Sequence, residues 1–253
     1  MDDDDTDNSM DSGDDGQVES LPTHIPIFPL NGVLLLPDAK LPLNIFEPRY
    51  LDMIRDAMSG NRIIGMIQPL QRTSGQAAGN DSRAGPGAVY DIGGAGRITA
   101  YEETPDGRFE ITLTGLSRFA ISEELSVTTR YRQVVADWDR FAADRWGEDD
   151  GTGVDRNRLL TALRAYLELA QIPAEWGAIE KAETSALITS LTMICPFGPA
   201  EKQALLEAHD LYERSRIMTA LVEMSLLQRT GGGRGGGGSG GGDDQDDDDH
   251  RIH

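Results

Sequence analysis

Between positions 21 and 141, hydrophobic residues fall into short runs separated by proline, glycine and polar residues. The run at 108–114 alternates strictly, with Phe109, Ile111 and Leu113 on one face, which is the period of a half-buried strand. The turn before it, Pro-Asp-Gly at 105–107, predicts a hairpin. Eight strands are expected on this basis: His24–Leu30, Val33–Leu36, Leu41–Phe46, Arg62–Leu70, Ala88–Glu103, Arg108–Thr114, Leu116–Ile121 and Arg130–Trp138. Strands this short and this numerous indicate an antiparallel barrel or a pair of packed sheets.

One helix is expected to interrupt the strands. It begins at Pro48, a residue suited to the first helical position, and Gly60 ends it. Apolar residues recur at helical spacing between these two positions. A polar loop is expected at 71–87, and the glycine-rich residues 93–96 favour a bulge or a close strand crossing.

From Asp155 onward the hydrophobic period changes to that of a helix, and three amphipathic helices are expected. Pro173 closes the first and Pro196 the second, while the third runs about 30 residues from Pro199 to Gly231. Three such helices with short connections form a bundle. Strands followed by helices make the chain α+β.

Composition divides the chain into four stretches. Residues 1–19 hold nine acidic residues and no basic residue, and residues 231–253 combine ten glycines with six aspartates. Segments of this composition have too little apolar surface to fold and are expected to be disordered. We therefore expect a β domain at 21–145 and a helical bundle at 146–230, between tails at 1–20 and 231–253.

The chain is strongly acidic, with a formal net charge of −20, of which the two tails carry −13. The remaining −7 argues against nonspecific nucleic-acid binding, which needs Lys and Arg to displace counterions, and against docking on an anionic membrane. No apolar run approaches the roughly 20 residues of a membrane span. The first residues are acidic where a signal peptide is basic. A cytoplasmic protein without a membrane partner is expected.

The residue types that carry most enzyme chemistry are sparse. Neither a P-loop nor a dinucleotide-binding glycine motif is present, and the four histidines lack metal-ligand spacing. The single cysteine, Cys195, excludes an internal disulfide and lies between apolar residues, as is typical of a buried structural thiol. His209 is expected on the surface of the third helix. We therefore expect no catalytic residue, no metal and no cofactor.

Three stretches of sequence resemble one protein family. Residues 25–58, IPIFPLNGVLLLPDAKLPLNIFEPRYLDMIRDAM, resemble the opening of the amino-terminal, substrate-recognition domain of Lon protease. Residues 91–121 resemble the family's second block, with D-G-R and G-x-x-R-F. Residues 195–208, CPFGPAEKQALLEA, resemble the helical end of standalone bacterial members. The resemblance covers about residues 21–230.

This resemblance implies a PUA-like β-barrel with attached helices, and a role in binding proteins or peptides. A full Lon protease continues into an ATPase module and a Ser–Lys peptidase module, and cereblon-type proteins continue into a zinc-bound domain. Neither continuation lies in these 253 residues. The chain is therefore expected to be a freestanding, bacterial-type homologue of this peptidase that lacks the protease domain.

Seven residues of the matching motifs are expected to stabilise the fold: Phe46, Glu47, Pro48, Arg49, Gly115, Arg118 and Phe119. Phe46 is expected to pack under the first helix, and Glu47 to favour the positive end of that helix.

A second group of aromatic and cationic residues provides candidates for peptide binding: Tyr50, Arg97, Tyr131, Arg132, Trp138, Phe141 and Trp146. Aromatic residues are enriched at recognition surfaces. We expect them in a cleft between the β domain and the bundle, overhung by the loop at 71–87, because ligand sites favour such junctions. The alternative is that these rings only join the two parts.

The function favoured by these observations is a noncatalytic module that binds unfolded or peptide segments of other proteins. It would serve in protein quality control, alone or together with a protease. Two alternatives stay open. One is a nucleic-acid-related module, because PUA-like barrels elsewhere bind RNA, and the other is an enzyme with an unrecognised site.

Overall fold

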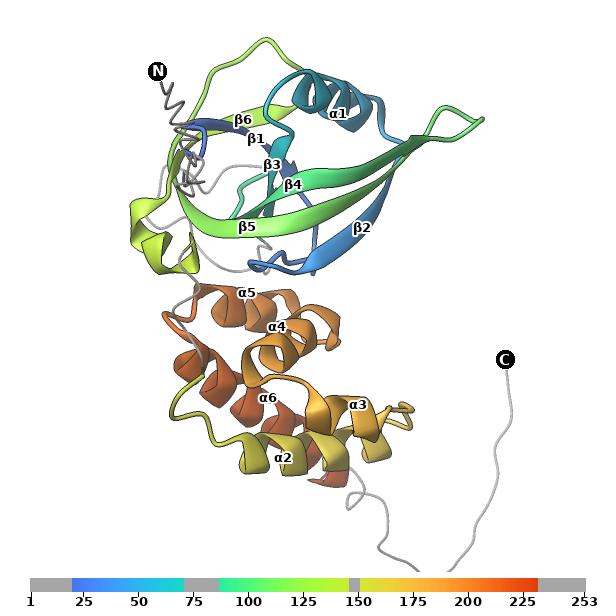
Figure 1. Cartoon of the computed structure of the whole chain (residues 1–253), viewed down its shortest axis with the longest axis vertical. Coiled ribbons are helices and arrows are strands. Elements are labelled where there is room, and N and C mark those ends of the chain that lie inside the picture. The colour runs from blue at the N-terminus through green and yellow to red at the C-terminus, as the bar shows by residue number, and fades with distance from the viewer. Residues whose placement is uncertain (1–19, 71–86, 146–150, 232–253) are drawn as a thin grey trace, which may run out of the picture. The chain divides into compact units, whose positions relative to one another are not determined.

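The computed structural model describes residues 20–70, 87–145 and 151–231 (Figure 1). The chain divides into two compact units, Met1–Trp146 and Gly147–His253, called here the β unit and the helical unit. No helix within the described ranges is long and apolar enough to cross a membrane.

One six-stranded sheet forms the β unit. Its strands are β1 (His24–Pro29), β2 (Lys40–Ile45), β3 (Ile63–Ile67), β4 (Ile92–Glu103), β5 (Phe109–Glu124) and β6 (Arg132–Asp137). Their order across the sheet is β2-β5-β4-β3-β1-β6, and β5 also pairs with β6. This extra pairing joins the second and last strands of that order, so the sheet curls round on itself (Figure 1). The neighbouring strands are antiparallel except β1 and β3, which are parallel.

The longest strand, β5, runs unbroken through the point where two strands were expected to separate. The prediction of distinct strands at Arg108–Thr114 and Leu116–Ile121 is therefore wrong. Gly115 lies inside β5, and the carbonyl oxygen of Leu36 occupies the space that a Cβ at this position would need. Gly115 thus permits close backbone packing and does not form a turn.

The apolar run Val33–Leu36 is not a strand, which also corrects the sequence prediction. Its three leucines are at most 3% exposed, so hydrophobic burial alone accounts for the pattern. A Cβ at Gly94 would overlap the carbonyl oxygen of Leu35. The glycine-rich residues 93–96 therefore form the close crossing that the sequence predicted, and β4 is also irregular between Ala95 and Gly96.

Helix α1 (Pro48–Ser59) begins and ends where the sequence predicted, with Gly60 as its C-cap. Its buried residues are Tyr50, Met53, Ile54 and Ala57. The expectation for Phe46 is wrong, because its side chain is 63% exposed. Side chains alternate between the two faces along extended backbone, and Ile45, only 2% exposed, takes the inward position.

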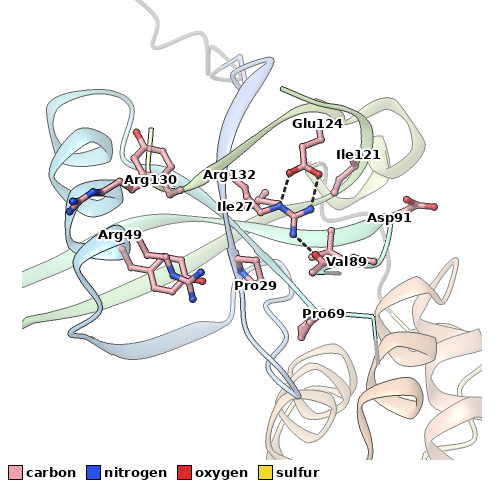
Figure 2. A pocket seen from close by; sticks show the side chains of 14 residues that line it. Ile27, Pro29, Arg49, Pro69, Val89, Asp91, Ile121, Glu124, Arg130 and Arg132 are labelled. Atoms are coloured by element: carbon pink, nitrogen blue, oxygen red, sulfur yellow. Dashed lines mark hydrogen bonds and ion pairs between the residues drawn. The ribbon is translucent and has the colours of Figure 1, made fainter. Parts of the chain in front are cut away.

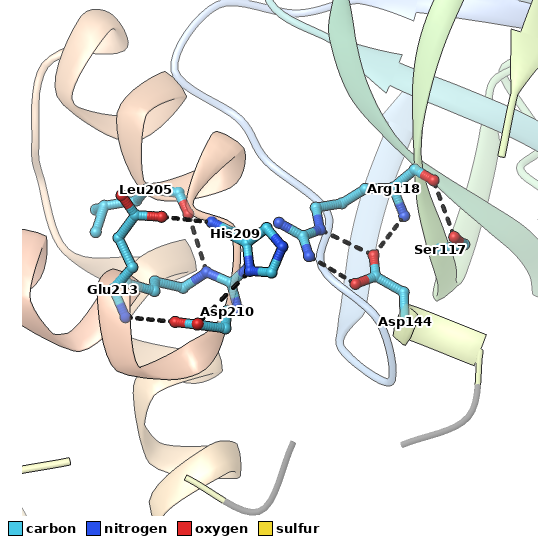
Figure 3. Close-up of polar contacts among 8 residues, drawn as sticks. Ser117, Arg118, Asp144, Leu205, His209, Asp210 and Glu213 are labelled. Atoms are coloured by element: carbon cyan, nitrogen blue, oxygen red, sulfur yellow. Dashed lines mark hydrogen bonds and ion pairs between the residues drawn. The ribbon is translucent and has the colours of Figure 1, made fainter. Parts of the chain in front are cut away.

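A buried ion pair ties the short 3₁₀ helix η1 (Asp139–Arg145) to β5 (Figure 3). The carboxylate of Asp144 accepts hydrogen bonds from the backbone N–H, Nε and Nη2 of Arg118, at 2.9, 2.9 and 2.7 Å. The two side chains are 5% and 9% exposed. The guanidinium group also lies 4.4 Å from the ring centre of Phe141. These contacts link β5 to η1, and the stabilising role expected for Arg118 stays a prediction.

In residues 151–231, the described part of the helical unit, there are five helices: α2 (Arg156–Leu169), α3 (Trp176–Lys181), α4 (Thr184–Ile194), α5 (Pro199–Glu207) and α6 (Leu211–Gly231). The sequence predicted three, because the hydrophobic stripes continue across two breaks. Their apolar faces share one core, which includes Leu159, Ile188 and Met218.

The break between α3 and α4 lies at Ala182 and Glu183, whose backbones are extended. Arg156 satisfies the carbonyl groups that this break leaves open. Its Nη2 donates to the backbone oxygens of Ile179, Glu180 and Ala182 at 3.0, 3.1 and 2.7 Å. A guanidinium group from α2 thus replaces the helical hydrogen bonds that end there.

The break between α5 and α6 is a capping arrangement (Figure 3). The carboxylate of Asp210 accepts from the backbone N–H of Glu213 at 2.7 Å, and the carboxylate of Glu213 accepts from the backbone N–H of His209 at 2.7 Å. These reciprocal bonds satisfy donors at the start of α6. His209 therefore lies at the break and not on a continuous helix, and its side chain is 91% exposed.

Candidate functional site: a pocket of arginine and tyrosine

A pocket of about 570 Å³ lies in the β unit (Figure 2). Its walls come from β1, α1, the end of β5 and the start of β6. Pro69, which precedes the undescribed residues 71–86, and the run 87–89, which follows them, complete the walls. A backbone bridge pairs Pro69 with Val89 and so brings the two sides of that gap together. We call this the arginine–tyrosine pocket, after Arg49, Tyr50 and the run 130–132 (Arg-Tyr-Arg).

The two tyrosines present buried rings to the pocket. Tyr50 is 5% exposed, and its ring centre lies 4.2 Å from that of Phe28 on β1. Tyr131 is 8% exposed, and its hydroxyl donates a hydrogen bond to a carboxylate oxygen of Asp56 on α1 at 2.7 Å. Burial, reinforced by the bond to Asp56, raises the pKa of Tyr131 to about 12. Burial likewise raises the pKa of Tyr50, with Arg49 opposing the shift.

The three arginines are held to different degrees. Arg132 makes paired bonds of 2.6 and 2.7 Å to the carboxylate of Glu124, and its Nη1 donates to the backbone oxygen of Gly87 at 2.7 Å (Figure 2). Arg49 lies 4.5 Å from the ring centre of Tyr50, and its Nε and Nη2 both contact one carboxylate oxygen of Glu47. Arg130 is 72% exposed and has only a 3.7 Å ion pair with Asp52 among the described residues.

About half of the residues that line the pocket are apolar. Ile27, which is fully buried, contributes to the lining together with Pro29, Pro69, Val89 and Ile121. The charged groups are the three arginines, Asp91 and Glu124, so the lining carries a net charge of +1. In Figure 2, Arg49 and Arg130 lie on the side of α1, and Val89 and Asp91 lie across from them. The arrangement therefore combines an apolar surface with cations along one side.

The comparison with known families decides the class of the protein. The model of the family described as "ATP-dependent protease La (LON) substrate-binding domain" matches residues 24–223. The chain belongs to the Lon substrate-binding domain family. The resemblance inferred from the sequence motifs is confirmed, and with it the class of module, a substrate-recognition domain.

Individual relatives agree with this assignment. The chain is 28% identical to a Lon protease of Flavobacterium johnsoniae over 201 residues, which are 78% of this chain and 23% of that protease. It is also 28% identical to a Lon protease of Desulfosudis oleivorans over 211 residues, or 81% of this chain and 24% of the protease. The chain thus spans about a quarter of the length of these curated relatives.

Solved structures of Lon N-terminal domains share the fold. A Lon N-terminal domain protein from Xanthomonas campestris has a TM-score of 0.54 and 22% identity, covering 79% of this chain and 98% of that one. The N-terminal domain of a Mycobacterium avium complex Lon protease has the same TM-score at 15% identity and the same two coverages.

Three of the candidate binding residues of this Lon-family chain line the pocket: Tyr50, Tyr131 and Arg132. Arg97 does not, and its guanidinium group donates to the backbone oxygen of Asn61 at 3.1 Å. Trp146 and residues 71–86 lie outside the described residues. The cleft expected between the two units stays a prediction.

Trp138 and Phe141 also lie away from the pocket and pack inside the β unit. The indole Nε1 of Trp138 donates to the backbone oxygen of Pro22 at 3.0 Å, and its ring centre lies 5.8 Å from that of Phe119. Phe141 is 5% exposed beneath Arg118. These contacts fit a structural role for both rings.

Two arginines of the pocket were missed as binding residues. Arg49 was placed among the motif residues that stabilise the fold, and Arg130 was not singled out. The sequence did contain a signal for Arg130, because it and Arg132 flank Tyr131 directly. No sequence pattern indicated that Pro69 and Val89 line the pocket, because their position depends on the backbone bridge that pairs them.

The helical unit holds the only cysteine, and its surroundings do not suit a nucleophile. Cys195 is 4% exposed, and burial raises the pKa of its thiol to about 11. The Nζ of Lys202, which is 8% exposed, donates to the backbone oxygen of Met193 at 3.0 Å. Within the described ranges, no group of three or more His, Cys, Asp or Glu side chains is placed to hold a metal ion.

Proposed function

We propose that the arginine–tyrosine pocket binds extended, unfolded segments of other proteins, and that the chain acts as a noncatalytic recognition module in protein quality control. The observation that carries this proposal is a pocket of about 570 Å³, lined by apolar, aromatic and arginine side chains, in a member of the Lon substrate-binding domain family. Unfolded segments differ from folded surfaces in offering apolar side chains to such a pocket.

A photo-crosslinking experiment tests the site. We would place a photoreactive phenylalanine analogue at Asp91, an exposed pocket residue, and at Glu103, an exposed residue of β4 outside it. Reduced, carboxymethylated α-lactalbumin serves as the unfolded protein and native α-lactalbumin as its control. Crosslinks from position 91 to the unfolded form alone support the proposal. Equal crosslinking from both positions, or to the native form, contradicts it.

The noncatalytic part of the proposal needs a separate measurement. The region matched to the family corresponds to its substrate-binding domain, and the thiol of Cys195 is buried. Purified protein should therefore neither hydrolyse ATP nor cleave casein above a buffer blank. Turnover that follows the protein through purification and disappears in a point variant would contradict it.

A further inference from the structure

The hydroxyl of Tyr50 is the unexplained polar group of the arginine–tyrosine pocket. The residue is 95% buried, yet among the described residues no hydrogen-bond partner for this hydroxyl is found. The hydroxyl oxygen is not sealed from solvent, because it is not one of the fully buried polar atoms that lack a partner. Tyr131, by contrast, directs its hydroxyl to Asp56. A ligand in the pocket can therefore reach the Tyr50 donor, whereas the Tyr131 donor is already used.

Two guanidinium groups of the pocket lining retain donors, and one of them, Arg49, stacks on the Tyr50 ring. The Nε and Nη2 of Arg49 share one oxygen of Glu47, and no partner for its Nη1 is found in the described part of the chain. Arg130 has one long ion pair, at 3.7 Å. Arg132 differs, because Glu124 and the backbone of Gly87 engage all three of its nitrogens. Arg132 therefore holds the wall of the pocket, while Arg49 and Arg130 are left to bind a ligand.

The lining of the pocket is far less acidic than the chain, which carries −20, because the lining residues sum to +1. Glu47, Asp52 and Asp56 contact Arg49, Arg130 and Tyr131 from just outside the lining and balance that charge. Recognition of an anion therefore depends on the donors that stay free and not on a net positive potential. Guanidinium and hydroxyl donors together suit a carboxylate, with which arginine forms short, charge-assisted bonds.

We propose that the arginine–tyrosine pocket selects substrate segments that carry an aspartate or glutamate side chain beside an apolar residue. The carboxylate is bound by the Tyr50 hydroxyl together with Arg49, Arg130 adds a cation at the rim, and the apolar neighbour packs on the partly exposed surface of Pro29, Pro69 and Val89. The two arginines lie 53% and 72% exposed, at the rim, so a chain can pass them without ending there. This inference rests on the proposed function and names the class of segment that is bound.

The test compares three dye-labelled nine-residue peptides by fluorescence anisotropy with the full chain. The first is capped at both ends and has one central Asp between Leu and Val, the second has Asn instead of Asp, and the third has Asn and a free C-terminal carboxylate. We expect the Asp peptide to bind about 10-fold or more tightly than the capped Asn peptide, the range for hydrogen bonds to a charged group. Equal binding of these two overturns the inference. If the third peptide binds as tightly as the first, the inference is also overturned, because the hydrogen-bond donors of the pocket then bind a terminal carboxylate equally well.

Variants locate the effect. Tyr50→Phe keeps the ring and removes the hydroxyl, so it should weaken the Asp peptide about 10-fold and leave the capped Asn peptide unchanged. Arg49→Gln should weaken the Asp peptide about 3-fold. Arg108→Gln is the matched control, because Arg108 is 52% exposed and lies 2.8 Å from Asp106, as Arg49 is 53% exposed and lies 2.8 Å from Glu47. A loss in Arg108→Gln equal to that in Arg49→Gln contradicts the assignment.

The outcomes separate this inference from the proposed function. If the Asp and Asn peptides bind equally, and crosslinking at position 91 still captures unfolded protein, the pocket is a recognition site without acidic preference. If neither capped peptide binds and position 91 does not crosslink, the proposed function fails together with the inference. Unchanged melting of Tyr50→Phe, measured alongside, keeps a loss of binding from being mistaken for unfolding.

Discussion

Removal of the Asp144 carboxylate should destabilise the β unit more than a surface ion pair would. Arg118 is only 5% exposed, and Asp144→Ala removes three of its hydrogen bonds, at 2.9, 2.9 and 2.7 Å. Breaking one partner of a buried pair costs about 3–5 kcal/mol, because the remaining buried charge loses its counter-ion. Since a domain is stable by only about 5–15 kcal/mol, this is a large fraction of the total.

The corresponding change in melting temperature follows from the size of the unit. A loss of 1 kcal/mol lowers the melting temperature by roughly 3–5 °C for a domain of this length, so Asp144→Ala should melt roughly 10–20 °C lower. Asp52→Ala is the control, because Asp52 is 42% exposed and 3.3 Å from Arg55, and exposed pairs contribute less than about 1 kcal/mol.

Urea unfolding of both variants, with hydrogen exchange by mass spectrometry, checks the prediction. Exchange should increase in β5 and η1 for Asp144→Ala and stay unchanged there for Asp52→Ala. The double variant Arg118→Met with Asp144→Leu should recover part of the loss, since it also removes the buried charge whose carboxylate partner is gone. If the double variant is less stable than Asp144→Ala, or if Asp144→Ala costs no more than Asp52→Ala, the argument from buried charge is refuted.

Three further predictions concern single side chains. Phe46→Ala should change the free energy of unfolding little, because the ring is 63% exposed, and a urea midpoint well below wild type would show that Phe46 packs against the fold. Tyr131 holds its proton more tightly in the folded chain than in the unfolded one, so its contribution to stability is complete below about pH 10 and is lost as the pH rises to about 12. Tyr131→Phe should abolish that dependence in urea midpoints measured across this range, and an identical dependence in the variant would rule the phenol out. Cys195 should react slowly with a thiol reagent at pH 8 and rapidly in urea, and rapid reaction of native protein would contradict its burial and a thiol pKa of about 11.

The hydrophobic period predicted which parts of the helical unit are helical. It could not predict where the individual helices end. The stripe of Ala204, Ala208 and Leu211 keeps helical spacing across the break, but α5 does not bury it: Ala204 is exposed, and Leu205 joins Leu211 in the core. The pattern of Asp210 followed three residues later by Glu213 was the available sign of a new helix, and capping is a local hydrogen-bonding effect that period does not report.

In the β unit, the sequence identified burial more reliably than backbone geometry. Leu34 to Leu36 are buried as their character suggests, but they cross glycines of β4 and β5 and do not form a strand. The pocket was predicted in part for a related reason. Tyr131 and Arg132 have chemistry that indicates recognition, whereas the availability of the Tyr50 hydroxyl depends on what the neighbouring side chains already bind.

The pairing of β1 with β6 also governs when the β unit can become complete during synthesis. His24 pairs with Val135, about 110 residues further along the chain, and β5 needs β6 along its last residues. While β6 has not yet emerged from the ribosome, the nascent chain has an open β1 edge and an unpaired end of β5. Open strand edges of this kind pair readily with other strands. Closure over so long a segment is also slow, because its entropy cost precedes the contacts that offset it. The chain for which we propose binding of unfolded segments therefore itself passes through a stage in which it resembles one.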